Sequence, residues 1–583
     1  MATLLVITVL LPLIGSVVLF LSPRLDVKSA RTIALGTALA ALALTLILIL
    51  AFRPGVMTPQ FAFDAGGGHY GLSWMDPPGI RFALGLDGIS VWLFGLTSLL
   101  MITAICASWE SVTDRAAMHY AFLLALQTGL LGLFASLDVV LFYIFFEFTL
   151  IPLFFIIGIW GGIERRRASI TFFLYTLAGS LLTLLGVISL VVVHYQHSPG
   201  HVLTFSIPEL TSGLAALKWP AWAETSAWTS PQVLIFLLLF AGFAIKVPMF
   251  PFHTWLPLAH VEAPAAGSIL LAGVLLKVGS YGLLRFNMGM TPLGARALFP
   301  LLATLAVIGV IYGALAALAQ TDVKRLVAYS SVSHMGFIVL GLFSMNSTGM
   351  DGATIQMINH GLTTGALFAC VGVLYERYHT REMADLGGLW ARLPLLAFFL
   401  ILASLGSAAV PGLNGFVGEF PILTGAFFRE SWSAVLAAGG MVLGAYYLLW
   451  MIQRILFGPL REPHAHAEGH DGAHGVTAAV RPVGWHEIAG LTPLMVFIVL
   501  IGILPGPFLN RIRPAVAPIA RRFERADEAE VAKNVRRIGA NPGQTPRART
   551  MAEVVELDRR SRSPSLASWA TEPSTPVASK GRR

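Results

Sequence analysis

The stretch FAIKVPMFPFHTWLPLAH, residues 243–260, places a lysine and three prolines inside an otherwise apolar segment. Pro248, Pro251 and Pro257 each remove a backbone donor and disrupt the helical turn that precedes them. Lys246 lies just before these prolines. A charge inside a bilayer is costly, so such a residue normally faces a bundle interior or a hydrated cavity. The stretch therefore predicts a discontinuous membrane helix that carries a functional cation.

A second stretch of the same kind, SAAVPGLNGFVGEFPIL, covers residues 407–423. Pro411, Pro421 and several glycines interrupt an apolar run that carries Glu419. Interrupted helices that recur in two halves of a transporter indicate inverted repeats, with an ion site near the membrane midplane. We therefore pair the fourth to eighth apolar spans with the ninth to thirteenth, which aligns Lys246 roughly with Glu419.

The rest of the chain is equally apolar. Of its 583 residues, 56% are hydrophobic and only 12% are charged, and the mean hydropathy is +0.74. Apolar runs of about 18 or more residues recur throughout, as expected of a polytopic membrane protein. The first run lacks a basic n-region and a small-residue cleavage site, so we expect a retained helix. The predicted fold class is all-α, with about 14 transmembrane helices at residues 3–22, 33–52, 85–108, 118–136, 138–159, 168–194, 232–257, 264–286, 298–320, 324–344, 353–374, 393–428, 433–457 and 487–509.

These spans suggest a division of the chain into five parts. The parts are N-terminal helices (1–117), a first repeat (118–286, broken near 246–257), a second repeat (298–457, broken near 411–421), a last helix (487–509) and a basic polar tail (510–583). The Arg, Pro and Ser content of the tail predicts a disordered extension without an apolar stripe, either solvated or in contact with a neighbouring subunit or lipid headgroups.

Basic residues indicate the orientation. Of the 39 Lys and Arg residues, 15 lie in loops after odd-numbered spans, 6 in loops after even-numbered spans and 16 in the tail. The positive-inside rule places the odd loops in the cytoplasm and both termini on the periplasmic side. The remaining two bases, Lys246 and Lys277, lie inside predicted spans.

Six ionisable residues lie within apolar stretches and form the candidate proton path: Glu147, Lys246, Lys277, His334, His360 and Glu419. Intramembrane ionisable groups are functional by default and commonly mark ion or proton paths. Gly273 and Gly279, close to Lys277, would leave room for water beside its ammonium group. A histidine can accept a proton at one ring nitrogen and donate one from the other. The pattern therefore indicates proton translocation.

Secondary candidates flank this path: Asp138, Tyr329, Ser333, His253 and Glu262. Asp138 opens the fifth span and is interpreted first as a boundary residue, although it could help proton entry. Tyr329 and Ser333 lie about one turn from His334 and could order water, while His253 and Glu262 flank the first broken helix.

Several other sites are excluded or disfavoured by the sequence. Cys106 and Cys370 have no CxxC partner, so the chain offers no cysteine-ligated iron–sulfur cluster. The GGGH at 66–69 lacks the helix and acidic residue that a dinucleotide site needs. A loop with four histidines is interpreted as variable and polar rather than as a metal site, because no cysteine or fixed carboxylate accompanies them; these are His464, His466, His470 and His474.

Four motifs allow a family resemblance to be drawn. They are KVPMFPFHTWLPLAHVEAP (Lys246–Pro264), TDVKRLVAYSSVSHMGF (Thr321–Phe337), INHGLTTGALF (Ile358–Phe368) and GLNGFVGEFPIL (Gly412–Leu423). Over about residues 1–510 the chain resembles the antiporter-like proton-channel subunits of respiratory complex I. That superfamily also includes subunits of cation/proton antiporters and of membrane-bound hydrogenases. In having an acidic residue at position 419, the chain resembles the M-type branch, since L-type and N-type subunits usually have a lysine there.

The resemblance implies roles for the buried groups. It places Lys246 beside Glu147 as a switchable pair, makes Lys277 the next relay position, and lets His334 and His360 pass protons to Glu419 as the terminal site. Structural alternatives remain: a static Glu147–Lys246 ion pair, satisfied hydrogen bonds at Lys277 and Glu419, and neutral histidines that hold backbone carbonyls.

The resemblance also implies a setting. A partner arm carrying FMN and iron–sulfur clusters would oxidise NADH and reduce a membrane quinone, while this chain, without a cofactor, moves protons beside L-type and N-type neighbours in a bacterial inner membrane. No nucleic-acid partner is expected. The alternatives are a subunit of a sodium/proton antiporter or of a membrane-bound hydrogenase, and, ranked last, a membrane scaffold, which would leave six buried ionisable groups without a reason.

Overall fold

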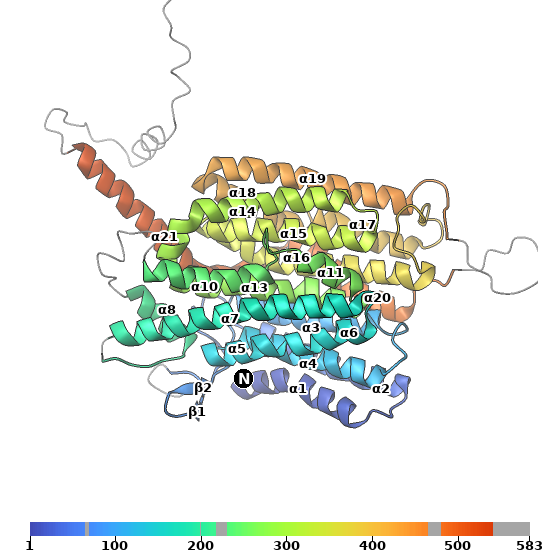
Figure 1. The fold of residues 1–583 in the computed structure, drawn as a ribbon, viewed down its shortest axis with the longest axis horizontal. Coiled ribbons are helices and arrows are strands. Elements are labelled where there is room, and N and C mark those ends of the chain that lie inside the picture. The colour runs from blue at the N-terminus through green and yellow to red at the C-terminus, as the bar shows by residue number, and fades with distance from the viewer. Residues whose placement is uncertain (65–68, 199, 217–229, 464–479, 540–583) are drawn as a thin grey trace, which may run out of the picture. The chain divides into compact units, whose positions relative to one another are not determined.

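The computed structural model describes residues 1–64, 69–198, 200–216, 230–463 and 480–539. The chain divides into two compact units, Met1–Ala520 and Arg521–Arg583, and every contact described below lies within the first. The elements, labelled as in Figure 1, are α1 (Ala2–Leu21), α2 (Val27–Ala51), β1 (Leu72–Met75), β2 (Ile80–Phe82), α3 (Ser90–Ala107), α4 (Ala116–Ala135), α5 (Val139–Phe148), α6 (Leu150–Trp160), α7 (Arg165–His197), α8 (Ile207–Ala216), α10 (Pro231–Lys246), α11 (Trp255–Glu262), α12 (Ala265–Leu270), the π-helix η1 (Leu271–Leu275), α13 (Leu276–Gly282), the π-helix η2 (Leu283–Met288), α14 (Pro292–Leu318), α15 (Val323–Phe343), α16 (Ser347–Tyr378), α17 (Pro394–Ser407), α18 (Asn414–Arg429), α19 (Ser431–Leu456), α20 (Trp485–Ile503) and α21 (Gly506–Gly539).

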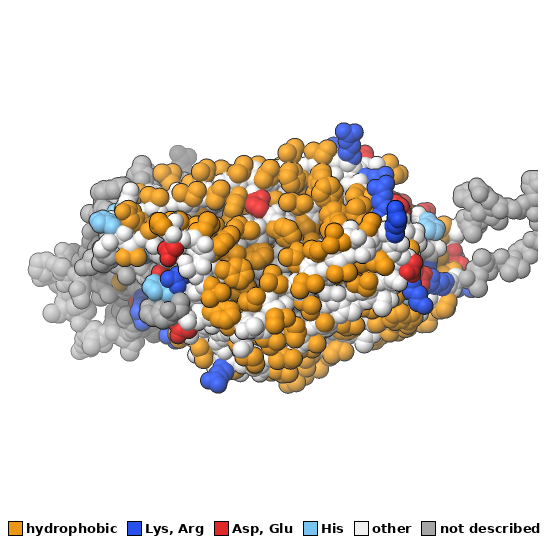
Figure 2. Space-filling view, turned by 90° about the horizontal axis from the view of Figure 1, so that it is seen from below, with side chains coloured by type: hydrophobic (Ala, Val, Ile, Leu, Met, Phe, Trp, Pro, Cys, Tyr) orange, Lys and Arg blue, Asp and Glu red, His pale blue; other side chains and the backbone are white. Residues whose placement is uncertain are grey.

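The helices confirm an all-α membrane fold. Within the described residues, 12 helices are long and apolar enough to cross a membrane, and α10 and α17 are shorter apolar helices. The total of 14 crossings stays a prediction. The long described helices run side by side, with α1 and α2 at one edge and α19 at the other (Figure 1). Figure 2 shows a face whose middle is covered by hydrophobic side chains, with Lys and Arg toward its two ends.

A small hairpin was not foreseen in the sequence. Strands β1 and β2 pair antiparallel, with Leu72 opposite Phe82 and a register irregularity between Ser73 and Met75. The four residues of β1 are all exposed, and the hairpin lies in the connection between α2 and α3. It therefore belongs to a loop and leaves the helical fold class unchanged.

The first predicted break lies between α10 and α11. Proline at 248 offers no N–H to the Ala244 carbonyl, which instead accepts a hydrogen bond of 2.9 Å from the N–H of Met249. The Ile245 carbonyl accepts 2.9 Å from the indole N–H of Trp255, the first residue of α11. The free end of α10 is thus satisfied inside the protein, as backbone at membrane depth requires.

The second predicted break lies between α17 and α18, at residues 408–413. Gly418 then allows α18 to pack closely on α16, because a Cβ at this position would lie 2.8 Å from the Cβ of Gln356. Both discontinuous helices are therefore confirmed. Lys246 and Glu419 are not at equivalent points, however: Lys246 is the last residue before its break, whereas Glu419 follows its break. The inverted symmetry of the two repeats stays a prediction.

Two irregular helices were not predicted. The fifth span divides into α5 and α6 at Thr149, whose hydroxyl donates 2.8 Å to the Phe146 carbonyl. The eighth span contains the π-helices η1 and η2 on either side of α13. π-Bulges are frequent at functional sites, since they shift backbone groups out of the regular ladder. Both irregular helices carry ionisable residues of the candidate path, Glu147 and Lys277.

The expected disorder of the tail is wrong for its first part. α21 continues the chain as a helix to Gly539. Ile512, Val516 and Ala520 are fully buried at a spacing of four residues, so the helix has the narrow apolar stripe that we did not recognise in a polar composition. Residues 540–583 lie outside the described residues, as do all four histidines of the polar loop, His464, His466, His470 and His474.

Candidate functional site

A buried polar network joins α13, α15, α16 and α18. The Lys277 ammonium group donates to the Ala272 carbonyl at 2.5 Å and is hydrogen-bonded to His360 Nδ1 at 2.7 Å. His334 Nδ1 is hydrogen-bonded to Glu419 Oε1 at 2.8 Å. All four residues are at least 96% buried. Lys277, His360, His334 and Glu419 are called the central polar chain below.

The two histidines form the middle of the central polar chain. The ring centroids of His334 and His360 lie 5.5 Å apart. His360 Nε2 is buried without a hydrogen-bond partner among the described residues. Because Lys277 donates to Nδ1, a neutral His360 carries its proton on Nε2, ready to be donated. A single water between the rings would complete a hydrogen-bonded path. Such a water needs two or more polar partners, and the ring nitrogens of His360 and His334 would supply them.

The surroundings of Glu419 include residues that the sequence did not single out. Gln356 Nε2 donates to Glu419 Oε1 at 3.0 Å, and Asn359 Nδ2 donates to the Asn414 carbonyl at 2.8 Å. Hydrogen bonds to the ionised form stabilise a buried carboxylate. Gln356 and Asn359 occur four and one residues before His360, a spacing that places polar groups on one face of α16 and could have been recognised.

His334 also has hydroxyl partners that sequence reasoning missed. Its Nε2 is 3.1 Å from Ser407 Oγ and 3.4 Å from the Tyr447 hydroxyl. Ser407 ends α17 at the second break, and Tyr447 belongs to α19. With Nδ1 carrying the proton donated to Glu419, Nε2 accepts from these hydroxyl groups. His334 is therefore hydrogen-bonded at both ring nitrogens.

Glu147 and Lys246 do not form a closed ion pair in this structure. The Lys246 ammonium group is buried without a hydrogen-bond partner among the described residues, and so is Glu147 Oε1. Lys246 Nζ instead lies 4.1 Å from the ring centroid of Phe146, a cation–π contact. The carboxylate of Glu147 still acts electrostatically on Lys246. The geometry is that of an open pair, and it argues against a static clasp.

The small residues near Lys277 do not provide space for water. A Cβ at Gly273 would overlap the Leu100 side chain, and a Cβ at Gly279 would lie 2.8 Å from the backbone nitrogen of Val247. Our expectation of water beside these glycines is therefore wrong. Their absence of side chains instead lets α13 and η1 approach neighbouring helices, and Lys277 is satisfied by the irregular carbonyl of Ala272 and by His360.

Asp138 has a structural position at the start of α5. Its Oδ1 accepts from the N–H groups of Val140 (2.8 Å) and Leu141 (3.2 Å), and its Oδ2 accepts from that of Arg81 (3.1 Å). Burial raises the pKa of Asp138, although these three backbone donors oppose the shift. Asp138 is thus an N-cap, and it also lines a cavity of about 90 Å³ with the side chains of Arg81 and Glu209.

The other secondary candidates lie outside the central polar chain. Ser333 donates to the Val310 carbonyl at 2.8 Å and fastens α15 to α14. Glu262 accepts from the backbone N–H of Glu164 at 2.9 Å. His253 is buried against Phe250 and Tyr312, with Nδ1 lacking a partner among the described residues.

Tyr329, the remaining candidate, is partly buried on α15, and its predicted role in ordering water stays a prediction. Three of the five secondary residues, Asp138, Ser333 and Glu262, therefore have structural partners that account for them.

His260 on α11 is a further buried histidine that the sequence did not bring forward. Both of its ring nitrogens lack hydrogen-bond partners among the described residues. Its ring stacks on Phe368 with centroids 4.7 Å apart and planes 3° from parallel. The positive charges of Lys324 and Lys277 both act on it. Its position after the prolines of the first broken helix was the available signal.

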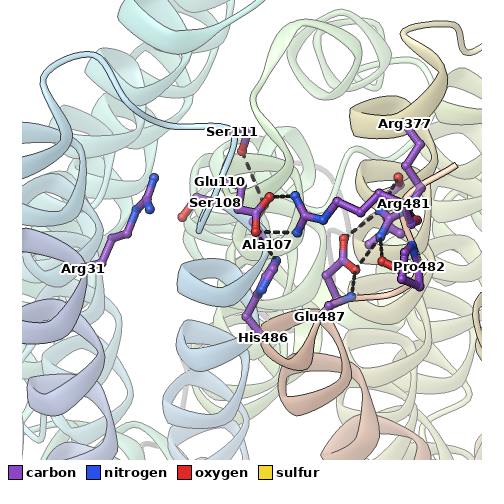
Figure 3. Close-up of polar contacts among 12 residues, drawn as sticks. Arg31, Ala107, Ser108, Glu110, Ser111, Arg377, Arg481, Pro482, His486 and Glu487 are labelled. Atoms are coloured by element: carbon purple, nitrogen blue, oxygen red, sulfur yellow. Dashed lines mark hydrogen bonds and ion pairs between the residues drawn. The ribbon is translucent and has the colours of Figure 1, made fainter. Parts of the chain in front are cut away.

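A second group of charges lies at one end of the bundle, where α16 ends and α20 begins (Figure 3). Arg377 donates to both carboxylate oxygens of Glu487, each at 2.8 Å, and to the Pro482 carbonyl at 2.9 Å. Arg481 forms an ion pair with Glu110. Bidentate pairs of this kind fix geometry, so this cluster joins the loop before α20 to the turn after α3 and to α16.

One basic residue lies in a different place from the one that we expected from the sequence. We counted Arg285 outside the spans, but it lies in η2 and forms a 2.5 Å ion pair with Asp87. The partner explains why the membrane tolerates it.

No metal or cofactor chemistry is indicated by the described part of the chain. Within it, no group of three or more His, Cys, Asp or Glu side chains could hold a metal ion. Cys106 and Cys370 are buried free thiols. What the buried groups can do chemically is to hold and pass protons.

Known proteins share this sequence and fold. The family described as NADH:quinone oxidoreductase/Mrp antiporter, TM, matches residues 136–444. NADH-quinone oxidoreductase subunit M of Rhodobacter capsulatus is 39% identical over 528 residues, covering 90% of this chain and 97% of that protein. NADH-ubiquinone oxidoreductase chain 4 of Chondrus crispus is 38% identical over 509 residues, covering 87% and 96%.

Solved structures agree. A chain of respiratory complex I from Thermus thermophilus with bound NADH superposes with a TM-score of 0.75 at 32% identity, covering 89% of this chain and 99% of that chain. A chain of the Mrp complex from Dietzia sp. DQ12-45-1b has a TM-score of 0.73 at 19% identity, covering 89% and 97%, which is a likeness of fold alone.

Proposed function

The chain belongs to the transmembrane family of NADH:quinone oxidoreductase and Mrp antiporter subunits, and we propose that its central polar chain carries the protons it moves. Its relatives over nearly their whole length are subunit M and chain 4. It is therefore an antiporter-like membrane-arm subunit of complex I, in which it translocates protons. The observation that supports the proposed path is the succession of two buried hydrogen-bonded pairs, Lys277–His360 and His334–Glu419, whose histidine rings lie 5.5 Å apart.

The proton steps follow from the hydrogen bonds. Lys277 gives a proton to His360 Nδ1 across 2.7 Å, and His360 releases the proton on Nε2 toward His334. His334 accepts at Nε2 and releases its Nδ1 proton to Glu419 across 2.8 Å. Each imidazole thus gains one proton and loses one, and returns to a neutral form of opposite tautomer. Glu419 holds the transferred proton until it leaves the chain.

Glu147 and Lys246 form the gate in this proposal. An open pair leaves the ammonium of Lys246 desolvated, which favours loss of its proton, and closure onto Glu147 favours the charged form. A change transmitted from the redox arm would open and close the pair. The unpartnered Lys246 Nζ and Glu147 Oε1 support this assignment, because both atoms are available to pair.

The setting is proposed with the family. NADH, FMN, iron–sulfur clusters and quinone would be bound by partner subunits, and L-type and N-type subunits would be its neighbours. The membrane would be the bacterial inner membrane, with both termini periplasmic according to the distribution of Lys and Arg. A sodium/proton antiporter is less well supported, since the Mrp chain is only 19% identical, against 39% for subunit M.

The function is tested with inverted membrane vesicles. Glu419→Gln removes the terminal acceptor, and Glu430→Gln makes the same change at an exposed position just after α18. We expect NADH-driven proton uptake to fall at least about tenfold in Glu419→Gln, because one pKa-matched transfer group contributes at least that much, and to be retained in Glu430→Gln. Native gels establish that the complex is assembled.

The rival function is tested in the same vesicles. We expect that a sodium gradient, applied without NADH, drives no proton movement that depends on Glu419. Wild-type vesicles and Glu419→Gln vesicles should therefore behave alike in this assay. Sodium-driven proton exchange of that kind, with NADH-driven uptake unaffected, would replace the proposal by antiport.

A further inference from the structure

An apolar cavity lies between α2, α3, α20 and the start of α21. Ile358 and Leu362 of α16, on either side of His360 in the sequence, also line it, but none of the four residues of the central polar chain does. Its volume is about 670 Å³, within the range of roughly 300 to 1,000 Å³ found for small-molecule sites. Leu39, Leu46, Leu99 and Phe497 are typical of its lining, which is apolar almost throughout. The proton path makes no use of this space.

The cavity is long and opens toward the surrounding membrane. Along α2 it extends from Leu35 to Leu50, a rise of about 22 Å at ~1.5 Å per residue. One leaflet of the hydrocarbon core is about 15 Å thick, half of ~30 Å. Leu39, Leu46 and Leu50 are 47%, 44% and 80% exposed, so this wall faces lipid. The cavity is therefore longer than one leaflet is thick, so a hydrocarbon chain that enters from one leaflet can lie within it along its whole length, against an apolar lining.

One end of the cavity carries a single cation. Arg511, in the first turns of α21, is the only charged residue among the described residues that line it. Its guanidinium lies 5.5 Å from the ring centroid of Trp92, and its Nη1 donates 2.9 Å to the Pro507 carbonyl. Its Nε is buried without a hydrogen-bond partner among the described residues. An arginine fork with free donors beside an apolar cavity matches a phosphate group.

We propose that this cavity is a binding site for one membrane phospholipid, with an acyl chain along α2, α3 and α20 and the phosphate on Arg511. A helix of a partner subunit is a poorer occupant. An apolar helix would leave the buried Nε of Arg511 without an acceptor, whereas a phosphate group supplies one. An acyl chain is thin enough, and it leaves the cation free to bind the headgroup.

The site is tested in the assembled complex, reconstituted with phosphatidylglycerol that carries a diazirine in one acyl chain. After illumination, lipid adducts are mapped on peptides by mass spectrometry. Ala489→Phe fills the cavity, and Ala438→Phe makes the same change at an exposed position of α19. Arg511→Gln removes the cation, and Arg513→Gln removes the exposed neighbour that pairs with Asp351.

We expect a lipid adduct on α2 or α20 of the unaltered complex. Arg511→Gln should reduce this adduct about tenfold, because it removes one charge-assisted hydrogen-bonding group. Ala489→Phe should abolish it, and both controls should retain it. A diazirine diacylglycerol without phosphate should label the cavity about tenfold less than the phospholipid. Equal labelling by the two lipids, or adducts unchanged by both test substitutions, would overturn the proposal. So would an unlabelled cavity that instead cross-links to a partner subunit.

Discussion

At the scale of single residues, the most informative atoms are buried polar atoms without partners. Lys246 Nζ, Glu147 Oε1 and His360 Nε2 are all of this kind among the described residues. Such atoms are costly in a static protein, and they are where a proton path needs water or a moving group. Most of these residues were predictable, because an ionisable side chain in an apolar stretch is visible in the sequence.

Other site residues could not be predicted in the same way. Gln356, Ser407 and Tyr447 are neutral, and neutral polar residues occur in membrane helices for many reasons. The spacing of Gln356 to His360 marks a shared face of α16, but it does not identify Glu419 as the partner of Gln356. Only packing brings Gln356 to Glu419, and Ser407 and Tyr447 to His334. The openness of the Glu147–Lys246 pair was also invisible, since the sequence records neither the distance between the two groups nor the contact of Lys246 with the ring of Phe146.

Lys246→Met separates a gate from a clasp. Removing one partner of a closed, buried ion pair costs about 3–5 kcal/mol, whereas Lys246 has no hydrogen-bond partner to lose among the described residues. We therefore expect NADH-driven proton uptake to collapse while the thermal stability of the purified complex is unchanged or higher. A large loss of stability with pumping preserved per assembled complex would identify a structural pair. Met is chosen because it keeps most of the lysine volume.

At the scale of the elements, prolines predicted both broken helices, whereas the π-helices and the break between α5 and α6 were not predicted. A proline removes a known donor at a known position. A π-helix depends on how its neighbours pack, and the sequence around Lys277 has no comparable signal. The prediction of a disordered tail was wrong for a related reason. The narrow apolar stripe of Ile512, Val516 and Ala520 does not show in the mean composition of the segment, which is polar.

Gly418→Ala tests the packing that positions Glu419. A Cβ at 418 would lie 2.8 Å from the Cβ of Gln356, the residue that hydrogen-bonds Glu419. Overpacking of this kind costs about 1–3 kcal/mol, so the complex should melt at a lower temperature and pump less. Gly439→Ala is the matched control, because a Cβ there meets no atom within 4 Å. Equal behaviour of the two variants in thermal unfolding and proton uptake would show that α16 and α18 tolerate separation.

At the scale of the whole molecule, the chain is a membrane-arm subunit of complex I that translocates protons, and we propose that this work depends on a partner subunit that oxidises NADH. The family and the overall fold were predictable from the four motifs, because the prolines, glycines and ionisable residues of these motifs occur at particular positions in particular helices. Which groups are connected in one conformation was not predictable. The structure pairs Lys277 with His360 and His334 with Glu419, places the two histidine rings 5.5 Å apart and leaves Lys246 without a hydrogen-bond partner among the described residues.

The measurement that tests the central claim most directly is the initial rate of NADH-driven proton uptake by inverted vesicles containing Lys277→Met, with Lys28→Met as control. Lys277 is fully buried at the head of the central polar chain, and Lys28 is exposed in the first turn of α2. With assembly verified on native gels, the account predicts that uptake per complex falls at least about tenfold in Lys277→Met and is retained in Lys28→Met. Full uptake in an assembled Lys277→Met complex would contradict the account. Methionine cannot carry a proton, so the transported protons would then follow a route that does not include residue 277.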